Sequence, residues 1–129
     1  MPRLTEQEYA DLLWRQKQGL QRAESLKKKG LGKVPEQTVL NAVRLHAKIN
    51  GWVVYHTYDS RRSEPGFPDI VATDGQRILF AELKNANGKL TVEQNQWINL
   101  LLHTGKVDVH VWRPEHIYDA IPNYFRGLQ

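Results

Sequence analysis

Residues 66–84 read GFPDIVATDGQRILFAELK, and this stretch decides the fold. Two mostly apolar runs, residues 69–73 and 77–84, flank the dipeptide Asp74-Gly75. Such a dipeptide between apolar runs is typical of a tight β-hairpin turn. We therefore expect two adjacent antiparallel strands.

The expected hairpin carries three charged side chains that would lie close together. Because side chains alternate along a strand, Glu82 and Lys84 share one face. Ile78 and Phe80 lie earlier on that face and are expected in the core. The two charges would then emerge where the strand leaves the core, which is costly unless something neutralises them. The paired strand, beginning at Asp69, adds a third charge.

These three side chains suit the hydrolysis of a phosphodiester bond. Two carboxylates suit Mg²⁺, with Mn²⁺ as a substitute, because these cations prefer oxygen ligands and accept phosphate oxygens. A metal held by Asp69 and Glu82 would acidify a bound water and neutralise a phosphate. Lys84 would hold the attacking water or offset developing charge. In the alternative interpretation, Asp69 only begins a strand, and Glu82 forms a surface pair with Lys84.

The rest of the chain predicts an α/β fold. The expected helices cover residues 5–29, 35–50, 91–104 and 114–121, two further strands cover 52–57 and 107–112, and the tail is expected to be irregular. Polar residues 58–66 are expected to form a mobile loop. A hairpin followed by a helical crossover to another strand implies a mixed sheet with helices packed on it.

Charge divides the chain into an arm, residues 1–33, and one domain, residues 34–129. The arm holds eight Lys/Arg against four Asp/Glu, whereas the domain holds ten of each. As a narrow amphipathic helix, the arm is expected to dock on its own domain or on another subunit. Its C-terminal lysines would favour nucleic acid or complement the helix dipole. These lysines are Lys27, Lys28, Lys29 and Lys33.

Composition limits the class of protein. With 129 residues and 40% apolar content, the chain fits one soluble domain with its own core. It has no cysteine, which excludes a disulfide framework and agrees with a reducing cytoplasm. We find neither an apolar run long enough to span a membrane nor the apolar region of a secretory signal. No membrane partner is therefore expected.

Two polar residues outside the hairpin each have a structural and a functional interpretation. Glu36 lies one turn before Leu40, on the buried face of the second expected helix. It would face either the helix dipole or a site at the edge of the core. Gln94 fits a capping box with Thr91, yet it also shares a helix face with Trp97.

Four motifs follow one another in the order that one group of nucleases uses. They are Glu36 on a helix, the strand start Pro68-Asp69, the strand Glu82-Leu83-Lys84, and the segment Gly88–Thr91 leading to Gln94. Through these motifs, over about residues 34–113, the chain resembles the PD-(D/E)XK nuclease superfamily and, more narrowly, the VRR-NUC (virus-type replication-repair nuclease) family. The resemblance implies a restriction-endonuclease-like core, with a mixed central β-sheet flanked by helices and here an extra N-terminal helix.

The resemblance also implies roles for individual residues. Asp69, Glu82 and the backbone carbonyl of Leu83 would bind Mg²⁺ or Mn²⁺. Lys84 would be catalytic, and Glu36 and Gln94 would complete the site. The resemblance gives no role to the arm.

Other residues are assigned from the sequence alone. Arg61 and Arg62 in the loop, and Lys89 before the third helix, are expected to contact DNA phosphates, although a solvated pair is the alternative for the two arginines. The five histidines show no metal-ligand spacing, and only His56 lies next to the loop. The four tryptophans are expected to pack inside the protein: Trp14, Trp52, Trp97 and Trp112.

Together these features predict a metal-dependent DNA endonuclease of phage or bacterial replication, recombination or repair, in the cytoplasm of a bacterial host. Small members of the resembled group are similar to Holliday-junction resolvases. Branched or junction DNA is therefore the expected substrate, and a homodimer the expected form, because a two-fold substrate matches a two-fold protein. The alternative is a catalytically silent module of the same fold that binds DNA or recruits a partner.

Overall fold

Four strands form one mixed sheet in the computed structural model of the chain, which describes residues 5–28, 34–57 and 62–127. The strands are β1 (Val53–His56), β2 (Ile70–Thr73), β3 (Ile78–Leu83) and β4 (Asp108–Trp112). The sheet order is β1-β2-β3-β4; β1 and β3 run antiparallel to β2, and β4 runs parallel to β3. The mixed sheet expected from the hairpin and the crossover is confirmed.

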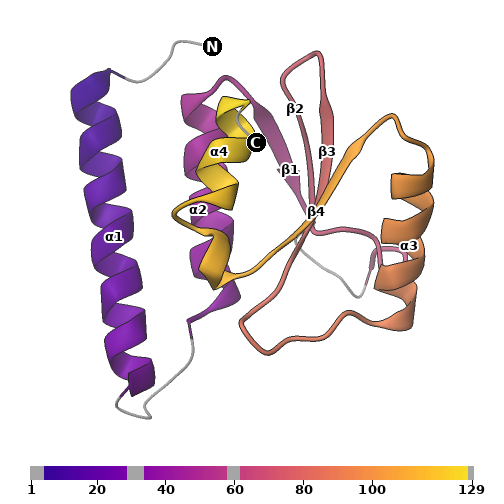
Figure 1. Cartoon of the computed structure of the whole chain (residues 1–129), viewed down its shortest axis with the longest axis horizontal. Coiled ribbons are helices and arrows are strands. Elements are labelled where there is room, and N and C mark those ends of the chain that lie inside the picture. The colour runs from indigo at the N-terminus through magenta and orange to yellow at the C-terminus, as the bar shows by residue number, and fades with distance from the viewer. Residues whose placement is uncertain (1–4, 29–33, 58–61, 128–129) are drawn as a thin grey trace.

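Helices cover both faces of this sheet, as Figure 1 shows. On one face lie α2 (Glu36–Ile49) and α4 (Ala120–Arg126), and on the other lies α3 (Val92–His103). The long helix α1 (Glu6–Lys28) packs outside α2, so the arm docks on its own domain. Among the described residues, no helix is both long and apolar enough to cross a membrane.

The turn between β2 and β3 is longer than the expected tight turn. Thr73 pairs with Ile78, so four residues, Asp74 to Arg77, make the connection. The Asp74 carboxylate accepts hydrogen bonds from the backbone N–H groups of Gln76 at 2.9 Å and Arg77 at 2.8 Å. These bonds stabilise the turn locally and hold the pKa of Asp74 below its usual range.

The two faces of β3 are buried differently from the expectation. Leu79, Ala81 and Leu83 are at most 1% exposed, on the face toward α2. Ile78 is 45% exposed and Phe80 is half-buried, so the prediction that Ile78 lies in the core is wrong. The main core lies between the sheet and α2, and the opposite face is covered only where α3 approaches it.

Helix α2 supplies much of the core, and it begins directly after a proline. Pro35 is its N-cap, with extended backbone, one residue before the first helical position expected for it. Leu40, Val43 and Ala47 are buried, as predicted. Helix α1 begins with the predicted capping pair, in which Thr5 and Glu8 exchange hydrogen bonds.

The tail differs most from the sequence prediction. A single turn of 3-10 helix, η1 (Pro114–His116), begins the expected helix, and α4 begins near its expected end and continues into the tail expected to be irregular. Pro122 is compatible with α4 because it lies in the first turn, where a backbone N–H has no helical partner. Tyr124 and Phe125 are buried against Trp52 and Trp112.

Two of the four tryptophans are fully buried, as expected. Trp97 is half-buried, and its ring lies 5.0 Å from that of Phe67. Trp14 on α1 is 63% exposed, so its prediction as a packing residue is wrong. Trp14 lies on a part of α1 that its own domain leaves uncovered, because α1 contacts α2 through other residues such as Tyr9.

Candidate active site

The centre of the candidate site is the pair of carboxylates at the open end of the hairpin. Ile70 pairs with Ala81, so extending the antiparallel register by one residue places Asp69 opposite Glu82. The Asp69 carboxylate accepts a hydrogen bond from the backbone N–H of Leu83 at 2.9 Å. On its other side, the Asp69 carbonyl accepts one from the N–H of Thr57 at 3.0 Å. The hairpin therefore brings Asp69 and Glu82 together as the sequence predicted.

Glu82 is a buried carboxyl group with one unsatisfied oxygen. It is 3% exposed, and its Oε1 accepts a hydrogen bond from the Gln94 side chain at 3.1 Å. Within the described part of the chain, its Oε2 receives no hydrogen bond, although Glu82 in its protonated form hydrogen-bonds to the Asp69 carboxyl. Burial, followed by the adjacent Asp69 carboxyl, raises the pKa of Glu82 far above its usual range, while Lys84 opposes the rise. A cation would remove the cost of ionising this group.

Glu36 contributes a third acidic group at the N-terminus of α2. It remains accessible to solvent, yet partial burial and then the Asp69 carboxylate raise its pKa. Lys84 lowers that pKa. Glu36 therefore lies close enough to the carboxylate pair and to Lys84 to interact with their charges. This agrees with its predicted position at the edge of the core.

Lys84 follows β3 directly and is fixed by contacts with the chain around it. Its backbone N–H donates to the carbonyl of Trp112 at 3.0 Å, which extends the parallel pairing with β4. Gly88 lies against the Lys84 side chain, because a methyl group on Gly88 would come 3.3 Å from Lys84 Cδ. Arg113 donates to the carbonyls of Asn85 at 2.9 Å and Gly88 at 2.6 Å, closing the turn after the lysine.

Sequence reasoning missed this function of Arg113. The residue follows an ordinary strand, and its partners lie 25 and 28 positions earlier in the chain. Local patterns therefore contain no signal of this bridge.

Gln94 forms its predicted capping box and at the same time contacts Glu82. Its Oε1 accepts from the Thr91 N–H at 2.8 Å, and its own N–H donates to Thr91 Oγ1 at 3.1 Å, which confirms the capping box. Its Nε2 donates to Glu82 at the same time. The first turn of α3 therefore orients the buried carboxyl group of β3.

A close approach at Gly66 brings α3 to the site. A methyl group on Gly66 would come 2.3 Å from the backbone carbonyl carbon of Glu93, and Gly66 has φ +83°. Only glycine fits this contact. The next residue, Phe67, packs edge-to-face between Phe80 and Trp97, with ring centroids 6.1 and 5.0 Å away. The segment leading to Asp69 is thereby wedged between β3 and α3.

The acidic groups fit a hard divalent cation that keeps several water ligands. Within the described ranges, no group of three or more His, Asp or Glu side chains could by itself hold a metal ion. The candidate ligands are thus the Asp69 and Glu82 carboxylates with the Leu83 carbonyl. The unsatisfied Glu82 Oε2 is the observation that such a cation would explain.

His56 borders this site without joining the carboxylates. Burial first, and Arg44 second, lower its pKa, whereas the nearby Asp69 carboxylate raises it. This places the ring at the end of β1, close to the start of β2. No metal-ligand role follows for it.

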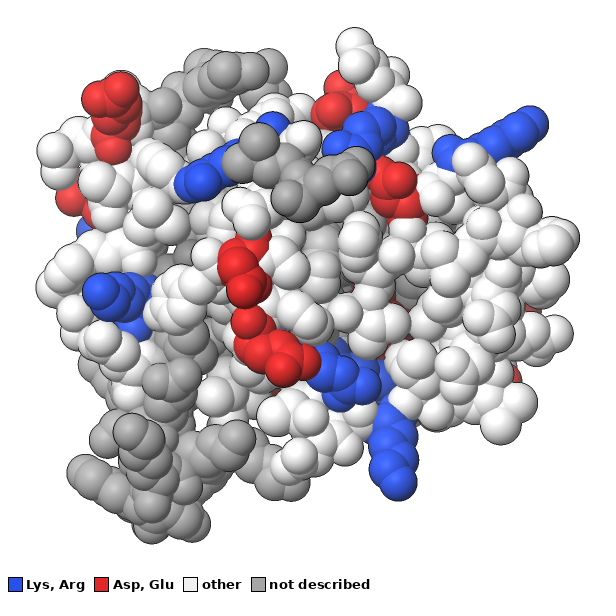
Figure 2. Space-filling view, viewed as in Figure 1, with Lys and Arg blue, Asp and Glu red and all other residues white. Residues whose placement is uncertain are grey.

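The predicted DNA contacts are only partly described. Arg62 and Lys89 are exposed, in the segments before β2 and before α3. Lys29, Lys33 and Arg61 lie outside the described residues, as do the side chains of Lys27 and Lys28 at the end of α1. On the face seen in Figure 2, the coloured Lys and Arg side chains are interspersed with Asp and Glu, so charge alone does not mark a DNA path there.

Comparisons of the chain with known protein families, with curated proteins and with solved structures find no match.

Proposed function

We propose that the protein is a metal-dependent DNA endonuclease. One observation carries the proposal: the buried Glu82 carboxyl lies beside Asp69, is held by Gln94, and keeps one oxygen unsatisfied. Burying acidic groups side by side costs stability, and a fold bears such a cost chiefly where the groups have a function. The order of the sequence motifs, from Glu36 to Gln94, also supports this proposal.

The residues would divide the work as follows. Asp69, Glu82 and the Leu83 carbonyl would hold Mg²⁺, with Mn²⁺ as a substitute. When bound, such a cation supplies an acidified water and neutralises phosphate charge. Gln94 orients the Glu82 carboxyl through its hydrogen bond. Lys84, fixed by Trp112 and Gly88, presents a cation toward the developing charge of the phosphate.

We further propose branched DNA, such as a Holliday junction, as the substrate, and a homodimer as the active form, in phage or bacterial recombination or repair inside the host cytoplasm. The exposed Trp14 supports the second point, because a large aromatic side chain on an uncovered helix face is typical of an interface centre. Arg62, Lys89 and the arm lysines would contact the phosphate backbone.

The decisive experiment measures DNA cleavage. Wild type and the Glu82→Gln, Lys84→Ala and Glu36→Gln variants are incubated with four-way junction, flap, single-stranded and duplex DNA, in Mg²⁺, Mn²⁺ or EDTA. We expect metal-dependent cutting by wild type, preferring the junction, and a loss of at least about 100-fold in the Glu82 and Lys84 variants. The Glu36 variant should lose less.

Matched controls are Lys106→Ala and Glu115→Gln, because both residues are exposed and lie outside the site. Absence of cutting by wild type in every condition, or equal cutting by the site variants and the controls, would reject the nuclease. Binding of junction DNA without cutting would support the silent module instead. Cutting without preference for branches would remove only the junction proposal.

A further inference from the structure

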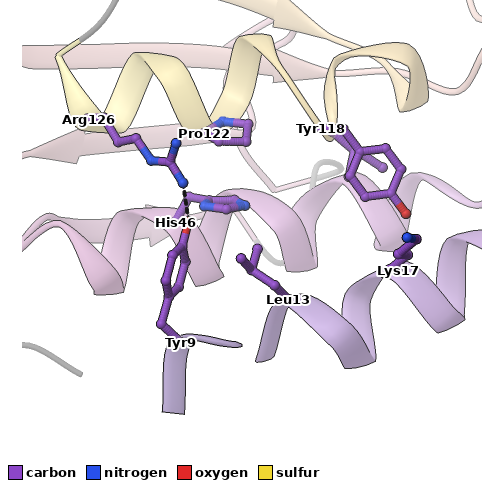
Figure 3. Close-up of a pocket in the computed structure, with 8 residues that line it drawn as sticks. Tyr9, Leu13, Lys17, His46, Tyr118, Pro122 and Arg126 are labelled. Carbon is purple, nitrogen blue, oxygen red and sulfur yellow. Dashed lines mark hydrogen bonds between the residues drawn. The ribbon is translucent and has the colours of Figure 1, made fainter. Parts of the chain in front are cut away.

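A second pocket lies on the far side of α2 from the sheet, where α1 meets the C-terminal elements. Its volume is about 240 Å³. This equals the liquid volume of about eight water molecules, enough for one ring bearing a charged group. Its walls, shown in Figure 3, are Tyr9, Leu13, Lys17, His46, Ile117, Tyr118, Pro122 and Arg126.

His46 is the unusual member of this lining. It is 1% exposed, and neither of its ring nitrogens has a hydrogen-bond partner among the described residues. Figure 3 shows the imidazole between Tyr9 and Pro122, with the Tyr9 ring edge-on at a centroid distance of 6.4 Å. Buried polar groups are nearly always hydrogen-bonded. This ring is therefore an unsatisfied polar group in the wall of the pocket, and its nitrogens expose almost no surface.

The charged side chains around the pocket share one sign. Arg126 lies at the Tyr9 end and Lys17 at the Tyr118 end, as Figure 3 shows. None of the lining residues carries a carboxylate. Arg126 already contacts the Tyr9 hydroxyl, so its guanidinium is held at the rim. A guanidinium beside a phenol at one end, with a second cation at the other end, gives the pocket a positive potential that favours an anionic group.

The remaining walls are apolar. Leu13 on α1, Ile117 just after η1 and Pro122 on α4 enclose the space beside the imidazole. Apolar walls with a few convergent polar groups are typical of small-molecule sites. The occupant that fits both the walls and the charges is an anionic group on a planar or apolar body.

We propose that this pocket binds a small organic anion, a phosphate or carboxylate carried on a ring-sized body, and that the bound anion holds α1 against the domain. Arg126 at the Tyr9 end would pair with the charge, Lys17 at the Tyr118 end would add to the positive potential, and the body would lie on Leu13 and Ile117 beside His46. Because three lining residues belong to α1, binding favours the docked arm by mass action. The proposal is independent of nuclease activity.

The test is an NMR titration of the full chain in EDTA, which keeps divalent cations away from the acidic site. Three probes distinguish the contribution of the ring from that of the anionic group. Phenyl phosphate carries both groups, phenol carries only the ring, and inorganic phosphate carries only the anion. We expect phenyl phosphate to shift the Leu13 methyl and His46 ring signals. Its affinity should exceed that of either fragment by about tenfold or more.

Variants at the pocket rim complete the test. Arg126→Ala should weaken phenyl phosphate binding about tenfold, since a charge-assisted hydrogen bond contributes on that scale, and Lys17→Ala should weaken it by a smaller factor. Both residues are exposed, so the fold should survive, which a thermal melt checks. Lys106→Ala, outside the pocket, should bind as wild type does. The proposal is overturned if phenyl phosphate does not bind, if phenol or phosphate binds equally well, or if the rim variants bind unchanged.

Discussion

The carboxylate of Asp69 lies 2.9 Å from the backbone nitrogen of Leu83 and accepts its hydrogen bond. The residue that would bind the metal thus also ties the start of β2 to the end of β3. Substitutions at this position will therefore affect both activity and stability, and the choice of replacement separates the two effects.

Asp69→Asn should retain the fold and lose cleavage. An asparagine oxygen can still accept from Leu83, so the free energy of unfolding should change by less than about 1 kcal/mol, whereas Asp69→Ala should lose about 1–3 kcal/mol. Urea unfolding and junction cleavage measure the two effects. If Asp69→Asn cuts DNA as wild type does, Asp69 is no metal ligand.

Gln94 can be dissected because its cap and its site contact use different atoms. Thr91→Ala breaks only the capping box and should cost about 1 kcal/mol with cleavage retained. Gln94→Glu keeps an acceptor for the Thr91 N–H but places a second carboxylate against Glu82, so cleavage should fall. Unfolding curves and cleavage rates distinguish the variants. Equal loss of cleavage in both would show that only the cap matters.

Gly66→Ala and Gly75→Ala form a matched pair. Both glycines have positive φ, but a methyl group on Gly75 meets no atom within 4 Å, whereas one on Gly66 collides with the Glu93 backbone. Gly75→Ala should therefore cost about 1–2 kcal/mol from the backbone alone. Gly66→Ala should cost about 3 kcal/mol or more, since the wedge at Phe67 must shift. Similar unfolding free energies for the two variants would contradict this close approach.

Acid should weaken the fold through His46. Burial, with a smaller effect of Arg126, lowers the pKa of His46 from 6.5 to about 4. The unfolded chain therefore takes up a proton first as pH falls. The neutral, buried His46 contributes fully to the free energy of unfolding above pH 6.5. This contribution falls by about 3 kcal/mol as the pH is lowered toward 4. His46→Leu should flatten this decline in urea unfolding from pH 7 to 4. The exposed His103→Leu should leave it unchanged, and equal slopes in all three proteins would refute the assignment.

Divalent cations should raise the melting temperature through the carboxylate pair. At a Mg²⁺ or Mn²⁺ concentration ten times the dissociation constant, binding to the folded state adds about 1.4 kcal/mol, which is several degrees for a domain of this size. Glu82→Gln should abolish the shift, and Glu115→Gln should retain it. A shift of the same size in both variants would indicate binding elsewhere on the surface.

The sequence was most informative where structure depends on neighbouring residues. The hairpin around Asp74, the capping box at Thr91 and the alternation of β4 are local signals, and each element is present. The hairpin also predicted that Asp69 lies near Glu82, but not their direct pairing, because the expected two-residue turn would have placed Asp69 opposite Phe80.

What the sequence could not supply depends on residues far apart in the chain. Ile78 has an apolar side chain typical of a core residue. It is exposed because α3 does not cover the part of the sheet face on which it lies. The buried contacts of Tyr124 form an aromatic cluster with Trp52 and Trp112 that no local pattern contains. The bridge from Arg113 and the unsatisfied His46 arise in the same way.

The parallel pairing of β4 with β3 has a consequence for how the site assembles. The carboxylates meet in a hairpin whose strands are neighbours in sequence, so they can come together early in folding. The backbone of Lys84 gains its partner at Trp112 only after the chain has passed through α3 and returned as β4. Closing that long loop is the slower step. We therefore expect the acidic half of the proposed site to assemble before the basic half, which is complete only when the last strand is in place.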